Sequence, residues 1–188
     1  MAEPVRRMPR AQRREQILDA AVRAFVHTGF AATNLDDVAA EAGITRVLLY
    51  RHFDTKADLY RAALDRACAR LAEAVGTDNF TENSISALVH AAAADPDGFR
   101  LLFRHANREP EFRDVTDRFT ATSAEVAHRN LTAAVPDGPW TRWAARLLPT
   151  FTTEAVIAWL DAGKPEPDQA ADRIGDAVHG IIAAATRP

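Results

Sequence analysis

The chain has 188 residues, of which 47% are apolar and 26% are charged. This length and composition suit a folded protein of one or two domains and exclude a disordered tail. No apolar run reaches the length of a membrane span, and the N-terminal residues lack the apolar stretch of a signal peptide, so we expect a cytoplasmic protein.

The net charge of −3 disfavours a nucleic-acid partner when it is taken alone, but the charge is unevenly distributed. Residues 1–60 contain nine Lys/Arg and eight Asp/Glu, whereas the rest of the chain contains fourteen and eighteen. Five arginines fall within the first fourteen residues, against one acidic residue, Glu3. This basic end is either the footprint of an anionic partner or a solvated tail.

Helical periodicity recurs along the chain without strand-like alternation, which predicts an all-α protein. A first helix is expected over residues 11–30, with Gly29 as its C-terminal stop. Thr33 is expected to cap a short second helix that ends at Gly43.

Thr45 is expected to cap a third helix that reaches Phe53, so that two short helices and a tight turn form the outline of a helix-turn-helix motif. At about 100° per residue, Leu49 and Phe53 share a face that packs on the first two helices. The opposite side carries Arg46, Val47, Tyr50 and Arg51.

A long fourth helix is expected over residues 56–76, where Thr55 and Asp58 have the spacing of a capping box. Pro149 falls inside a later expected helix, so a kink or an interruption is expected there. The further helices are expected over residues 84–94, 97–107, 111–134, 140–162 and 168–186.

The stretch TNLDDVAAEAGITRVLLYRHFDTKADLY, with the amphipathic helix before it, closely resembles the DNA-binding domain of TetR-family transcriptional regulators. The resemblance covers residues 10–60, and the rest of the chain has the all-helical layout of that family. The matching positions are the helix-opening Thr33, the turn glycine Gly43, the run Leu49-Tyr50-Arg51-His52-Phe53, and Lys56.

The resemblance implies a helix-turn-helix DNA-binding domain with a basic arm over residues 1–55 and a helical ligand-binding and dimerisation domain over residues 56–188. The arm before Ala11 either enters a minor groove or stays disordered. The implied DNA contacts are Arg46, Val47 and Leu48 at base edges, Tyr50 and His52 at the backbone, Thr33 and Lys56 at phosphates, with Thr45 and Arg51 completing the set.

Two apolar sets in the C-terminal part of the chain suggest further sites. One either lines a cavity for an apolar ligand or is ordinary core. It comprises Phe99, Leu102, Phe103, Phe112, Phe119, Trp143, Leu147 and Phe151. The other has the spacing of a helical dimer interface. It comprises Ala155, Ala158, Trp159, Ala170, Ile174, Ala177, Val178, Ile181 and Ala185.

Acid-histidine pairs at i, i+3 spacing offer an alternative function, because such pairs hold di-iron sites in helix bundles. They also arise freely on solvated helices. An all-α metal-dependent enzyme or carrier is therefore the second hypothesis. The residues concerned are Glu125 with His128, Asp176 with His179, and the carboxylates Glu73 and Glu154.

We predict a TetR-like transcriptional repressor that has no enzymatic activity, cofactor or metal. It is expected to bind a palindromic operator in double-stranded DNA as a homodimer, and to be released from it by a small apolar effector. No membrane partner is expected.

Overall fold

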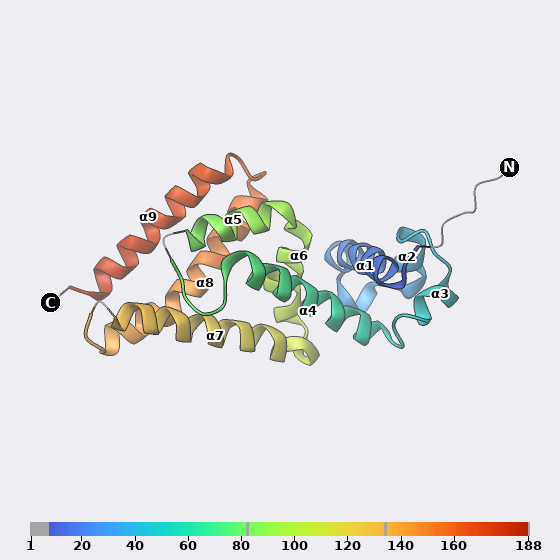
Figure 1. Cartoon of the computed structure of the whole chain (residues 1–188), viewed down its shortest axis with the longest axis horizontal. Helices are drawn as coiled ribbons and strands as arrows, with labels where there is room; N and C mark the ends of the chain where they lie inside the picture. Colours follow the sequence, from blue (N-terminus) through green and yellow to red (C-terminus); the bar gives the residue numbers. More distant parts are fainter. Residues whose placement is uncertain (1–7, 82, 134, 188) are drawn as a thin grey trace. The chain divides into compact units, whose positions relative to one another are not determined.

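The computed structural model describes residues 8–81, 83–133 and 135–187, and every regular element in this part of the chain is a helix, which confirms the all-α fold. None of these helices combines the length and the apolar character that a membrane crossing requires. The elements, coloured along the chain in Figure 1, are α1 (Arg10–Ala32), α2 (Leu35–Glu41), α3 (Arg46–Tyr50), α4 (Lys56–Val75), α5 (Ser84–Ala94), α6 (Pro96–Arg100), η1 (Leu101–His105), η2 (Ala106–Arg108), η3 (Pro110–Phe112), α7 (Arg113–Thr132), α8 (Pro139–Asp161) and α9 (Pro167–Ala185).

The chain forms two compact units, Met1–Asp65 and Arg66–Pro188. The first contains α1, α2, α3 and the beginning of α4, and the second contains the end of α4 and all later helices. The functional boundary expected between residues 55 and 56 stays a prediction, whereas the compact units divide within α4.

The turn between α2 and α3 follows from one glycine. Gly43 has φ of 63°, a left-handed conformation that a side chain disfavours. Its N–H donates to Ala40 O at 3.0 Å and the N–H of Ile44 donates to Ala39 O at 2.9 Å, which is the Schellman pattern that ends helices. The side chain of Thr45 then accepts a hydrogen bond from the N–H of Leu48, so the predicted cap of α3 is confirmed.

The junction between α1 and α2 differs from the prediction. Gly29 has φ of 80° and breaks the helix as expected, but one more turn follows, to Ala32. The cap of α2 is Asn34, whose side chain accepts from the N–H of Asp36 at 2.9 Å, so the expected cap at Thr33 is wrong. The Thr33 hydroxyl instead donates to Gly29 O at 2.6 Å, and thereby gives this carbonyl near the end of α1 a hydrogen-bond donor.

The start of α4 is built as the sequence predicts. Thr55 and Asp58 form a reciprocal capping box, in which each side chain accepts a hydrogen bond from the other residue's N–H. One turn later Tyr60 is fully buried, with its ring 4.8 Å from Phe25 and 4.9 Å from Phe30. These aromatic contacts hold α4 against α1 within the first unit.

The second unit packs α7 on α8, α5 on α9, and α8 on α9. A kink or an interruption was expected at Pro149: the interruption is wrong, because α8 continues from Pro139 to Asp161, and the kink stays a prediction. The segment expected as one helix over residues 97–107 changes type along its length: α6 leads into the π-helix η1, which widens the turn around Phe103, and then into the 3-10 helix η2.

Candidate nucleic-acid interface

Helix α3 separates its side chains as predicted. Leu49 is fully buried in the first unit, while Val47 is 65% exposed and Tyr50 is 39% exposed. Arg46 and Arg51 are exposed as well, and Leu48 lies between these extremes. The outer face of α3 therefore combines cations with a solvated valine and a solvated tyrosine.

Arg46 is held in place before any partner arrives. Its guanidinium lies 2.9 Å from Asp36 of α2 and donates to the Tyr50 hydroxyl at 3.3 Å, and it also stands over the Tyr50 ring. The hydrogen bond to Tyr50 and the charge of Asp36 raise the pKa of Arg46 above its ordinary value. These contacts orient the guanidinium on the exposed surface where α2 and α3 meet.

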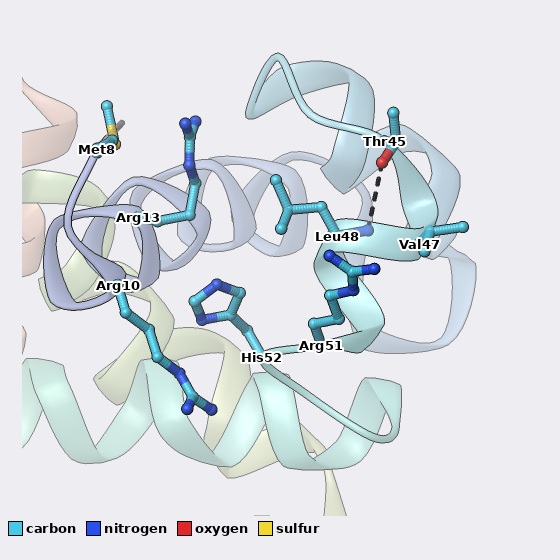
Figure 2. Close-up of a pocket in the computed structure, with 8 residues that line it drawn as sticks. All are labelled: Met8, Arg10, Arg13, Thr45, Val47, Leu48, Arg51 and His52. Carbon is cyan, nitrogen blue, oxygen red and sulfur yellow. Dashed lines mark hydrogen bonds between the residues drawn. The ribbon is translucent and has the colours of Figure 1, made fainter. Parts of the chain in front are cut away.

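A basic pocket opens beside α3 (Figure 2). It is lined by Met8, Arg10, Arg13, Thr45, Val47, Leu48, Arg51 and His52. Sequence reasoning placed Arg10 in the arm and did not single out Arg13. The structure places both on the first turn of α1, where their spacing of three residues puts them on neighbouring positions. Arg6 and Arg7 of the arm lie outside the described residues.

His52 is half-buried at this pocket. Burial lowers the pKa of the His52 imidazole, and the charges of Arg10, Arg14 and Arg13 lower it further. Figure 2 shows the ring on the side of α3 that faces α1, whereas Val47 points away from the α1 arginines.

Two residues implied as phosphate ligands have other partners. Thr33 is only 4% exposed and its hydroxyl is bonded to Gly29 O. The Lys56 ammonium donates to Phe30 O at 2.8 Å, Ala31 O at 3.1 Å and Thr33 O at 3.1 Å, which uses all three of its N–H groups. These bonds hold the Lys56 ammonium at the carbonyl end of α1, and its contact with a phosphate stays a prediction.

Comparison with known proteins agrees with this geometry. Residues 17–63 match the sequence model of the bacterial regulatory proteins of the tetR family. The chain is 34% identical over 139 residues to the HTH-type transcriptional activator FasR of Mycolicibacterium smegmatis, an alignment that covers 70% of this chain and 60% of FasR. It is 35% identical over 89 residues to the HTH-type transcriptional repressor SCO4008 of Streptomyces coelicolor, covering 47% and 46% of the two chains.

The chain belongs to the TetR family. A solved TetR-like transcriptional regulator from Rhodococcus sp. RHA1 has the same fold, with a TM-score of 0.82, 24% identity, and coverage of 94% of this chain and 99% of that one. The chain spans less than two thirds of the length of either curated relative. These relatives are regulators rather than enzymes, in agreement with the expected lack of enzymatic activity.

The aromatic set of this TetR-family chain separates into two parts. Phe103 is half-buried, with its ring 4.7 Å from Phe99 and 5.4 Å from Phe119. Trp143, which belongs to the same apolar set, is 42% exposed and pairs with the exposed Trp140, with 6.0 Å between the ring centroids. Its indole therefore lies on the surface of the second unit, and its part in a ligand site stays a prediction.

Most of the expected dimer stripe packs inside the protomer. Ala170 and Ile174 are buried, and Val178 and Ile181 pack against the core that α7, α8 and Ala185 form. Trp159 is also buried, and its indole N–H donates to Pro165 O at 2.8 Å. The stripe faces inward because α9 packs on α5 and α8 through it. Of the remaining residues, Ala158 and Ala177 are exposed and Ala155 is half-buried.

The di-iron hypothesis finds no support among the described residues, where no three His, Cys, Asp or Glu side chains come together to hold a metal. His128 pairs with Asp137 at 3.1 Å, and the ring of His179 contacts Gly175 O. Both histidines thus have local partners on the surface of the second unit.

A substitution separates the two roles considered for Lys56. Lys56→Met should lower the free energy of unfolding by about 1 to 3 kcal/mol, because three carbonyls lose a charged donor. It should leave unchanged the slope of log affinity for DNA against log salt concentration. A phosphate contact would instead lower that slope by about 0.9 per protomer.

Thermal unfolding and fluorescence anisotropy across salt concentrations provide the two readouts. Arg51→Gln, which removes an exposed cation of the pocket, is the matched control and should show the opposite result: a lower slope and unchanged stability. A reduced slope with unchanged stability for Lys56→Met would return that residue to the phosphate contacts.

Proposed function

We propose that this chain is a transcriptional repressor that binds a palindromic operator as a homodimer and leaves it when a small apolar effector binds. The observation that carries DNA binding is the outer face of α3, where Val47 is 65% exposed beside Arg46 and the basic pocket. A major groove admits one helix, and there an apolar side chain contacts a thymine methyl while arginine bonds guanine.

The contacts of Arg46 suit a residue that reads a base. Its ion pair with Asp36 is exposed, and exposed pairs contribute only about 0 to 1 kcal/mol. Exchange of this pair for two hydrogen bonds to guanine, which contribute about 1 to 3 kcal/mol of discrimination, is therefore favourable. Meanwhile Tyr50 keeps the guanidinium close to the helix before binding.

The direction of regulation rests on where the operator lies. FasR is named an activator and SCO4008 a repressor, so both outcomes occur among the relatives. Repression needs only that a bound dimer block a promoter, without a contact to the polymerase. A reporter gene behind the selected operator, with and without the chain, decides between them.

Selection of bound duplexes from random DNA tests the operator proposal, and a palindrome is the expected result. Arg46→Ala should then cost about 1 to 3 kcal/mol per half-site and relax one base preference. Arg23→Ala is the matched control, because Arg23 forms an equally exposed pair with Glu41 at 2.8 Å but lies on α1. Equal loss on operator and unrelated DNA for Arg46→Ala would show that Arg46 only positions the protein.

The dimer is proposed on the outer faces of α8 and α9. These helices pack on each other, and Ala158 on α8 and Ala177 on α9 are exposed. Small residues let helix backbones approach closely, and a twofold pairing would bring the same patch of both protomers together.

Two charges placed on that patch should disrupt the dimer. Ala158→Arg with Ala177→Arg is expected to give a monomer by light scattering and to weaken operator binding, without loss of helical content. Ala121→Arg, at an exposed position of α7, is the control and should stay dimeric. A double variant that remains a dimer would place the interface elsewhere.

The effector site is proposed at Phe103. This side chain is half-buried between Phe99 and Phe119, and it projects from the π-helix η1. Apolar rings that are only partly covered offer surface to an apolar ligand. If effector binding favours a separation of the two α3 helices that differs from the one in the operator complex, it lowers the affinity for operator.

A compound that raises the melting temperature should therefore weaken operator binding by about 5- to 150-fold, a typical allosteric coupling. Phe103→Leu should reduce both effects, whereas Trp143→Leu should retain them, because Trp143 lies on the surface. The measurement is a titration of the compound into the protein–operator complex. A compound that stabilises the protein but leaves operator affinity unchanged contradicts the proposal.

A further inference from the structure

The pocket beside α3 concentrates positive charge that the described part of the protein leaves without acidic partners. Arg10 and Arg51 pair with no carboxylate among the described residues, and Arg13 donates to the neutral Gln16 side chain at 2.8 Å. The other lining residues, Met8, Thr45, Val47 and Leu48, carry no charge. The pocket therefore presents three permanent cations and one titratable group, His52.

His52 faces only cations among the charged groups that act on it. Arg10, Arg13 and Arg14 approach it from α1, and Arg51 precedes it in the chain. Arg14 is held by its position over the Phe53 ring, at 5.1 Å. Burial and these arginine charges keep the pKa of His52 below its ordinary value of 6.5, so the imidazole is neutral near pH 7 in the absence of a ligand.

We propose that this pocket takes one phosphate group, that in the operator complex the group is a backbone phosphodiester of the DNA, and that its binding places a proton on His52. The proposal rests on the proposed function for its DNA ligand and adds a proton to the binding equilibrium. Guanidinium groups suit the anion because their planar forks bond phosphate oxygens bidentately.

Electrostatics explains why phosphate binding leads to protonation of His52. A phosphate in the pocket brings a negative charge next to His52 and offsets the arginine charges that oppose protonation, so the pKa of His52 rises on binding. The contribution of His52 protonation to phosphate affinity is full when the pH is below the pKa of His52 in the free protein. It is lost as the pH rises through the pKa of His52 in the complex. Between these two values affinity falls by up to about tenfold per pH unit for each pocket.

The test measures affinity for the selected operator and for an unrelated duplex between about pH 5.5 and 8, at constant ionic strength. Wild-type protein should bind both duplexes more tightly as pH falls. His52→Gln should lose that gain and match wild type at the alkaline end. His27→Gln, which removes an exposed histidine of α1 outside the pocket, should behave as wild type.

The imidazole itself provides a second readout. In NMR titrations of the full chain, the His52 ring should titrate at higher pH with DNA bound than without it. Arg13→Gln should raise the pKa of His52 in the free protein and reduce the shift on binding. Equal pH dependence for His52→Gln and wild type, or an unshifted His52 titration on DNA binding, would overturn the proposal.

Titration with inorganic phosphate separates this inference from the proposed function. If wild-type protein binds no duplex at any pH, the proposed function fails. A His52 pKa that rises with inorganic phosphate, and depends on Arg13, would then support the pocket as a site for free phosphate. No response to either ligand would overturn the pocket as an anion site.

Discussion

The conformation of Gly43 is the constraint on which the DNA-facing unit depends. Its positive φ ends α2 in a Schellman turn and starts α3 only three residues later, at Arg46. Because α3 spans five residues, its rotation about its own axis is set almost entirely by this turn and by the Thr45 cap. Leu49 then enters the core, and that burial forces Arg46 and Val47 outward. A different turn geometry would expose Leu49 and bury the side chains that face the solvent.

Part of this arrangement was predictable because it depends on local chemistry. Thr45 and the Thr55–Asp58 pair cap the nearest helix, and a cap needs only the residues within one turn. The cap at Thr33 was wrong because Asn34 beside it is also a good cap, and the Thr33 hydroxyl is used by Gly29 at the end of α1. Which of two adjacent candidates acts as the cap depends on the preceding helix.

Other contacts could not be predicted because sequence spacing does not specify them. An apolar stripe on α9 shows that one face is covered, but whether by the same chain or by a second copy depends on where α5 and α8 lie. Lys56 at a helix start is compatible with a phosphate, and only the distance to three carbonyls of the α1 end shows another role. The pocket shared by α1 and α3 is a similar case, since Arg13 and His52 lie far apart in the chain.

The balance of fixed and titratable charge explains how a chain with a net charge of −3 keeps a cationic surface without destabilising it. A fourth permanent cation beside Arg10, Arg13 and Arg51 would add repulsion to the folded state at all times. Histidine avoids this repulsion, because burial and the neighbouring arginines keep it neutral while the pocket has no anion. His52 then becomes charged only when a phosphate compensates for its charge. The repulsion from the arginines, which keeps His52 neutral in the free protein, is the interaction that the phosphate offsets.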